Sequence, residues 1–151
     1  MIYLGADHRG FKMKQKISKY LESLDEDFYD VGAFDFVSDD DYNDYAHELC
    51  LGVRLKKGNL GFLFCGSGVG MDVVANKHAG IRSALCFNSS IAKQSREHLG
   101  CNVASIPSDF LNFDDVKKIV DVFIRTPFSF EPRHARRVGK IVKLEEEFGV
   151  Y

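Results

Sequence analysis

The sequence predicts an α/β fold in which helices cover both faces of a five-stranded parallel sheet. Short apolar runs that suit buried strands alternate with longer amphipathic segments along the 151 residues, a pattern typical of successive strand-helix-strand units. The length suits a single domain, residues 1–151, that buries about two-thirds of its unfolded surface. An apolar share of 45% and a charged share of 28% are ordinary for a soluble globular protein.

Five strands and six helices are expected in alternation. In the first helix Phe11, Ile17 and Leu21 recur at helical spacing, and Lys12 and Lys16 take the solvent side. The last helix is polar enough to suggest that it packs partly on another subunit. The predicted strands are 2–6, 27–31, 60–65, 81–86 and 102–106, and the predicted helices are 11–24, 42–57, 69–77, 89–98, 114–125 and 133–148.

Composition excludes several classes of protein. No apolar stretch approaches the roughly 18 residues of a membrane span, and the N-terminus has no basic leader, so we expect a cytoplasmic protein without membrane contact. The four cysteines are too far apart for CxxC pairs and are expected to be free thiols. Basic residues show a small, scattered surplus outside one C-terminal cluster, which gives little support for nucleic-acid binding.

The segment CGSGVG at 65–70 is the most informative motif. It follows an apolar strand and precedes a helix, so its backbone N–H groups lie at a corner where ligands bind in open parallel sheets. Met71 stands where a dinucleotide fingerprint needs glycine and where a cysteine phosphatase needs arginine, and no Gly-Lys-Ser/Thr follows. A serine hydrolase elbow would need glycine at Cys65. The motif therefore predicts an anion-binding loop with a thiol at its edge.

Cys65 has two interpretations. An isolated cysteine is usually a small buried hydrophobe, which is how we interpret Cys50, Cys86 and Cys101. At the mouth of a glycine loop that enters a helix, however, the thiolate is favoured, and we expect a lowered pKa for Cys65 that makes it a usable base.

Further polar residues occupy positions where either a structural or a functional role is possible. Asp7 and His8 follow the first strand, so they should meet the Cys65 loop at the carboxyl edge of the sheet, although Asp7 could be a helix N-cap and His8 a solvated residue. His98 ends a helix and could simply face its dipole. Arg133 and Arg137, with His134 between them, share a helix face, which is either solvated surface or a forked phosphate site.

Taken together these segments resemble the ribose-5-phosphate isomerase B and galactose-6-phosphate isomerase family. The resemblance covers nearly the whole chain, and the central block is highly specific for the branch whose base is a cysteine, closer to the ribose-phosphate enzymes. It is carried by GADHRGF at 5–11, DYNDYA at 41–46, CGSGVGMDVVANKHAGIRSALC at 65–86, SREHLGCNV at 95–103 and RHARRV at 133–138.

The resemblance implies a Rossmann-like three-layer αβα sandwich, a homodimer or dimer of dimers with shared active sites, and neither metal nor cofactor. It implies that Cys65 moves the proton between C2 and C1 of a sugar phosphate, that Ser67 and the loop N–H groups hold the enediolate, and that His98 opens the sugar ring. Residues expected to bind substrate are Asp7, His8, Tyr42, Gly66, Gly68, Val69, Gly70, Arg133, His134 and Arg137.

Two positions depart from the family pattern. Leu99 stands where the family commonly has asparagine after the ring-opening histidine, and Asn43 stands where it often has proline. The expected reaction is aldose–ketose isomerisation of ribose 5-phosphate. The alternatives are isomerisation of a six-carbon sugar phosphate, such as allose or galactose 6-phosphate, and a binding module for sugar phosphates or nucleotides without turnover.

Overall fold

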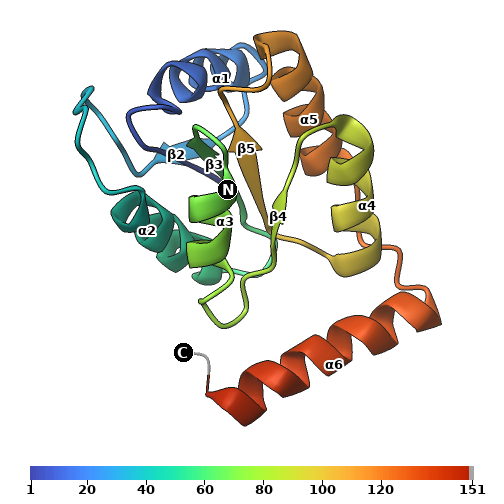
Figure 1. Cartoon of the computed structure of the whole chain (residues 1–151). Helices are drawn as coiled ribbons and strands as arrows, with labels where there is room; N and C mark the ends of the chain where they lie inside the picture. The colour runs from blue at the N-terminus through green and yellow to red at the C-terminus, as the bar shows by residue number, and fades with distance from the viewer. Residues whose placement is uncertain (150–151) are drawn as a thin grey trace.

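The computed structural model describes residues 1–149 and contains the predicted alternation of strands and helices (Figure 1). The strands are β1 (Ile2–Ala6), β2 (Phe28–Asp30), β3 (Leu60–Cys65), β4 (Ser83–Leu85) and β5 (Val103–Pro107). The helices are α1 (Phe11–Ser23), α2 (Tyr42–Arg54), α3 (Val69–Ala75), α4 (Ser89–Leu99), α5 (Phe113–Arg125) and α6 (Pro132–Phe148).

The strands form one parallel sheet in the order β2-β1-β3-β5-β4. The chain builds outward from β1 to one edge and from β3 to the other, so the strand order reverses between β1 and β3. Ligands of open α/β sheets bind outside the carboxyl ends of the strands at such a switch point. Here β1 ends at Ala6 and β3 at Cys65, directly beside each other.

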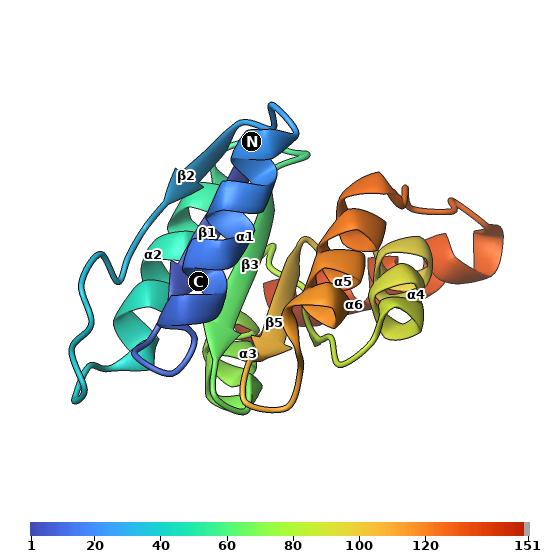
Figure 2. The ribbon, with the colours of Figure 1, turned by 90° about the horizontal axis from the view of Figure 1, so that it is seen from above.

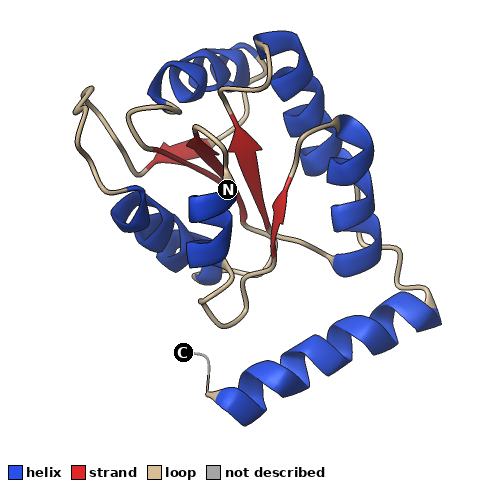
Figure 3. Ribbon diagram, viewed as in Figure 1, coloured by secondary structure: helices blue, strands red, loops and turns tan. Residues whose placement is uncertain are grey.

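Helices cover both faces of the sheet, which confirms the predicted three-layer arrangement (Figure 3). Helices α1, α4 and α5 pack on one face, against Phe62 and Phe64 of β3. Helices α2 and α3 pack on the other, against Leu63 and Cys65. Because successive side chains of a strand point to opposite faces, this alternation directs the Cys65 thiol toward α2 and α3.

The observed boundaries differ from the predicted ones by one to three residues, the largest difference being at the end of α2, which stops at Arg54 instead of residue 57. Strands β2 and β4 are three residues long, shorter than the predicted segments 27–31 and 81–86. Each has only one neighbouring strand, so fewer backbone groups are held in a ladder. At the start of the predicted fourth strand the Arg82 N–H bonds to the Asn102 side chain, 2.9 Å away, instead of to another strand.

Helix α6 stands apart from the three layers. It runs as a separate rod below the amino ends of the strands in Figure 1, and Figure 2 shows it behind α4 and α5. His134 is its only buried residue among those described, whereas Leu144 and Phe148 are 51% and 73% exposed. An apolar groove lined by Ile81, Cys101 and Leu144 separates this helix from the body.

Candidate active site

The cysteine loop lies at the switch point of the sheet. Cys65 is the last residue of β3 and is 7% exposed. The chain then turns through Gly68, whose φ of 74° suits glycine, and α3 begins at Val69. A side chain at Gly68 would also lie 2.6 Å from Leu85. The loop therefore stays narrow, and backbone N–H groups of Gly66 and Gly68 donate to the Cys65 sulfur.

Asp7 is the nearest ionisable partner of Cys65. Its side chain is 3% exposed, and its Oδ1 accepts the backbone N–H groups of Arg9, 3.0 Å away, and Gly10, 2.9 Å away. Asp7 therefore holds the turn before α1 and is not the helix N-cap considered from the sequence, because the N-cap residue is Gly10 and no side chain caps this helix. The same carboxylate also hydrogen-bonds to the Cys65 thiol. Asp7 therefore links the loop after β1 to the base proposed from the sequence.

The predicted direction of the Cys65 pKa is wrong for the isolated chain. Burial, followed by the charge and hydrogen bond of Asp7, raises the pKa of the thiol to about 11, whereas the Gly68 and Gly66 N–H groups lower it. The sequence indicated the stabilising N–H groups and placed Asp7 near the loop, but it did not indicate the apolar α2 and α3 side chains that bury the sulfur. In this arrangement the thiol holds its proton until another group or charge intervenes.

His8 is held on two sides. Its Nδ1 lies 2.7 Å from Oδ1 of Asp40, and its backbone N–H donates to the same oxygen over 3.1 Å. The Phe36 ring packs edge-on against the imidazole, with centroids 6.3 Å apart. Both partners come from the acidic segment before α2, in which the sequence analysis identified no site residue. No local pattern distinguishes Asp40 from its acidic neighbours, so its pairing with a histidine 32 positions earlier could not be predicted from the sequence.

Two other contacts shape the mouth of the site. Tyr42, the first residue of α2, lies over Gly70, where a side-chain carbon would come within 2.7 Å of the tyrosine ring. Arg9 lies over Gly66 and pairs with Asp109, which follows β5. Ser67 and Val69 are exposed beside them. The segment that contains Arg9 was expected beside the Cys65 loop, but no role was predicted for Arg9 and Asp109 was not identified, although both follow strand ends at the carboxyl edge.

The remaining predicted residues form a second cluster on α4 and α6. The rings of His98 and His134 stack with centroids 4.3 Å apart and planes 30° apart. His134 is only 3% exposed, and its Nδ1 lies 2.6 Å from Oγ of Ser129. Burial, then the neighbouring His98, lowers the pKa of His134. This geometry makes His134 a support beneath His98 rather than a group open to a ligand.

Arg133 and Arg137 are exposed on the same helix, as their spacing predicts. Arg133 pairs with Glu131, its Nε 3.0 Å from Oε2, across two exposed side chains. An exposed pair of this kind is weak and can exchange for a better anion.

The two clusters lie at opposite ends of the sheet within one chain. The segment after α4 reaches the start of β3, where the Gly61 N–H donates to the Asn102 carbonyl over 2.8 Å. Cys65 lies four residues further along β3, about 13 Å away at about 3.3 Å per residue. In Figure 1 the loop entering α3 is at the top, whereas the end of α4 and all of α6 are at the bottom. One chain therefore does not bring His98 or the arginines to Cys65.

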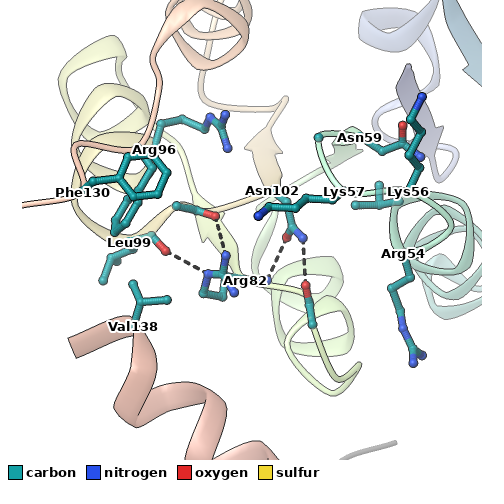
Figure 4. Close-up of a pocket in the computed structure, with 15 residues that line it drawn as sticks. Arg54, Lys56, Lys57, Asn59, Arg82, Arg96, Leu99, Asn102, Phe130 and Val138 are labelled. Atoms are coloured by element: carbon teal, nitrogen blue, oxygen red, sulfur yellow. Dashed lines mark hydrogen bonds between the residues drawn. The ribbon is translucent and has the colours of Figure 1, made fainter. Parts of the chain in front are cut away.

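A cleft of about 540 Å³ lies at the amino edge of the sheet and is not lined by Cys65 (Figure 4). Its central arginine is already engaged: Arg82 donates from Nε to the Leu99 carbonyl over 2.8 Å and from Nη2 to the Gly100 carbonyl over 2.9 Å. Arg96 donates in the same way to the carbonyl of Cys101. These arginines stabilise the backbone conformation of the segment after α4 through hydrogen bonds to its carbonyl groups. The candidate active site is therefore the switch point and not this cleft.

Residues 1–149 contain no cluster of three or more His, Cys, Asp or Glu side chains that could hold a metal ion. No described helix is long and apolar enough to cross a membrane. The groups that the described residues place at the switch point are a thiol, a carboxylate, a histidine and the N–H groups of the glycine loop.

Comparison with known proteins identifies relatives over the whole fold. The family described as Ribose/Galactose Isomerase matches residues 2–141. The probable ribose-5-phosphate isomerase B of Mycoplasma pneumoniae is 38% identical over 97% of this chain and 95% of its own. Ribose-5-phosphate isomerase B of Mycolicibacterium paratuberculosis is 35% identical over 95% of this chain and 91% of its own.

A solved structure gives the same result in three dimensions. Ribose-5-phosphate isomerase B of Mycoplasma genitalium, with bound ribulose-5-phosphate, superimposes with a TM-score of 0.92 at 35% identity, covering 97% of this chain and 96% of the other. Sequence and fold agree over nearly the full length of both chains. This chain therefore belongs to the ribose/galactose isomerase family.

Proposed function

We propose that the protein interconverts ribose 5-phosphate and ribulose 5-phosphate as an aldose–ketose isomerase. The observation that carries this function is the Cys65 thiol at the switch point, beside Asp7 and the glycine loop, in a chain whose relatives are ribose-5-phosphate isomerases B. One of those relatives holds ribulose-5-phosphate in its structure. The reaction needs one base, fixed donors for the enediolate and an anchor for the phosphate.

In this mechanism Cys65 is the base. Its thiolate removes the proton from C2 of the open-chain aldose, and the carbonyl oxygen on C1 takes up the negative charge of the enediolate. The thiol then returns the proton to C1, and the proton of the C2 hydroxyl passes to the oxygen on C1, so that C2 becomes the ketone and C1 carries a hydroxyl. The Ser67 hydroxyl and the loop N–H groups that do not contact the sulfur hold the oxygens on which charge develops.

Asp7 supplies a route to the thiolate. The Cys65 thiol already hydrogen-bonds to this carboxylate, so passing the proton to Asp7 gives a thiolate and a neutral carboxylic acid without changing the total charge. A cation brought close to the sulfur favours the thiolate further, because an opposite charge stabilises the ionised form. Within one chain His98 and the guanidinium groups of Arg133 and Arg137 are at the far end of the sheet, so we consider a second subunit as their source.

We infer that the site is completed by a second copy of the chain in a homodimer or a dimer of dimers. The partner's end of α4 would bring His98 for ring opening, and its α6 would bring Arg133 and Arg137 to the substrate phosphate beside His8. His134 supports His98 in this arrangement. The exposed apolar residues of α6, including Leu144 and Phe148, fit a helix that packs on the other subunit.

Subunit mixing tests the shared site. Cys65→Ala and His98→Ala should each lose nearly all isomerase activity while remaining folded, because each removes one half of the site. After subunit exchange, half the dimers carry one of each subunit, and one site of such a dimer is intact, so mixing should restore about a quarter of wild-type activity. Exchange between tagged and untagged Cys65→Ala subunits is the control and should restore none.

Two results would overturn this proposal. An active Cys65→Ala enzyme would remove the assigned base. Exchange that is demonstrated by mass spectrometry but restores no activity would mean that Cys65 and His98 do not act across a subunit boundary.

Substrate length and cellular location complete the proposal. Leu99 places an apolar side chain, 40% exposed, beside His98, so kcat/KM should be compared between ribose 5-phosphate and the 6-phosphates of allose and galactose. A clear preference for a six-carbon sugar would replace the five-carbon assignment. The four free cysteines suit a reducing compartment, and we place the protein in the cytoplasm.

A further inference from the structure

Asp40 is an unusual carboxylate in the loop before α2. Its side chain is only 6% exposed, although neighbouring Asp39 is exposed. Its Oδ1 receives both the Nδ1 and the backbone N–H of His8, at 2.7 and 3.1 Å, and its Oδ2 is buried without a hydrogen-bond partner. Burying a carboxylate is costly unless its partners compensate. The two hydrogen bonds from His8 are the contacts that compensate for burying the Asp40 carboxylate.

Other roles for Asp40 do not account for this arrangement. Asp41, not Asp40, is the N-cap residue of α2. The ion pair that Asp40 forms among the described residues is with His8, and Tyr45 is its other polar neighbour. Asp40 therefore acts on the imidazole rather than on the helix or on a lysine or arginine.

The contact determines which nitrogen of His8 is available. A carboxylate accepts hydrogen bonds, so Nδ1 carries a proton and donates it to Asp40. Nε2 is then the nitrogen left for a ligand. Because Phe36 packs against the ring edge-on, and the backbone N–H of His8 is fastened to the same carboxylate oxygen, the imidazole has little freedom to flip.

We propose that Asp40 is a positioning residue that presents Nε2 of His8 to the phosphate of the substrate. This rests on the proposed function, in which His8 contacts that phosphate. When a phosphate binds at Nε2, the imidazole takes up a second proton there and donates to an anion at each nitrogen, a charge-assisted arrangement that strengthens both contacts. Asp40 thus contributes to phosphate binding through His8, without itself contacting the substrate.

Three single variants separate geometry from charge. Asp40→Ala removes both. Asp40→Asn keeps an oxygen that can accept the Nδ1 proton but removes the charge. Asp39→Asn makes the same charge change one position away on an exposed side chain with no role in the site, and it is the matched control. Each is measured for KM and kcat with ribose 5-phosphate, for competitive inhibition by inorganic phosphate, and for the ¹⁵N shifts of the His8 ring.

Asp40→Ala should raise KM and the inhibition constant of phosphate about tenfold, equivalent to about 1.4 kcal/mol, the scale of a hydrogen bond to a charged group. The change in kcat should be smaller than the change in KM. The ¹⁵N shifts should move from a single Nδ1-protonated form to a mixture of tautomers. Asp40→Asn should keep the single tautomer with an intermediate loss of phosphate affinity, and Asp39→Asn should match wild type.

A double variant separates this proposal from the function on which it rests. If Asp40 acts through His8, the phosphate affinity of His8→Ala/Asp40→Ala should equal that of His8→Ala alone. Additive losses, or an Asp40→Ala protein with unchanged tautomer and phosphate affinity, would overturn the positioning role. Phosphate titration and the ¹⁵N shifts need no turnover, so a wild-type protein inactive on ribose 5-phosphate would refute the proposed reaction and leave these readouts to decide the role of Asp40.

Discussion

Replacing Asp7 by asparagine should make Cys65 more reactive toward an alkylating agent but less active as a catalyst. The asparagine oxygen can still accept the N–H groups of Arg9 and Gly10, so the turn after β1 is preserved. What disappears is the negative charge beside the sulfur. A negative neighbour disfavours the thiolate, so its removal lowers the pKa of Cys65.

The structure sets the size of this effect. A rise in the pKa of Cys65 from 9.0 to about 11 opposes ionisation by about 2.7 kcal/mol. Burial is the largest cause, so we assign roughly half, about 1.4 kcal/mol or tenfold in thiolate at a fixed pH, to Asp7. A thiolate of lower pKa is also a weaker nucleophile, with a Brønsted coefficient of about 0.4–0.5, so the observed alkylation rate should rise only about three- to fourfold.

The assay is iodoacetamide labelling at pH 8, followed by mass spectrometry of the Cys65 peptide. The other three cysteines provide internal references, because they are at most 2% exposed and burial raises the pKa of each to about 11 or 12. Asp39→Asn is the control and should label at the wild-type rate. Isomerase kcat should fall in Asp7→Asn, because the acceptor of the thiol proton is gone.

Two results would refute the reasoning. Labelling of Asp7→Asn that is as slow as wild type, or slower, would mean that Asp7 does not oppose ionisation of Cys65. Faster labelling with an undiminished kcat would mean that Asp7 does not accept the thiol proton during turnover.

Three further predictions follow from packing, ionisation and the departures from the family pattern. Gly10→Ala should lower the free energy of unfolding by about 3 kcal/mol in urea denaturation, because its new carbon would lie 2.0 Å from the Phe64 carbonyl oxygen. Gly139→Ala on α6 is the control and should not lower it, because nothing lies within 4 Å of the new carbon, and equal stability of the two variants would contradict the packing argument. The pKa values of the four thiols are raised in the folded protein, so the folded protein keeps protons that the unfolded chain releases from about pH 9. The free energy of unfolding of the reduced protein should therefore fall as pH rises from 9 to 11, by at most about 5 kcal/mol per pH unit, and a urea midpoint that does not change over this range would contradict the raised pKa values. Leu99→Asn should raise kcat/KM for ribose 5-phosphate about fivefold by adding one hydrogen bond of about 1 kcal/mol, and steady-state kinetics showing no gain would remove residue 99 from the substrate site.

The order of strands and helices could be predicted because it depends on local patterns. The period of apolar residues distinguishes strand from helix within a few residues, and CGSGVG marks a strand end, a tight turn and a helix start without reference to the rest of the chain. The same logic placed Asp7 and Cys65 at one edge, because the carboxyl ends of parallel strands lie together. Exact boundaries were less accurate, by one to three residues, since the length of a strand such as β4 depends on pairing with a neighbour and the end of a helix such as α2 on its local contacts.

The contacts around the site could not be predicted in this way, because they join distant parts of the chain. Asp40 meets His8 across 32 positions and Asp109 meets Arg9 across 100, and no local pattern specifies either pair. The sign of the Cys65 pKa change depended on the same kind of information: donors in the local loop lower it, but side chains packed from α2 and α3, together with Asp7, outweigh them.

By itself the sequence determined the strand-helix alternation, the cysteine loop and the chemistry its residue types allow, because each depends on neighbours along the chain. Only the tertiary structure decided that β1 and β3 meet at the switch point, that Asp7 keeps the Cys65 proton in place, and that His98 and the α6 arginines lie at the opposite end of the sheet. The physical reason is that charge, burial and hydrogen bonding act through space over a few ångströms, whatever the separation in sequence.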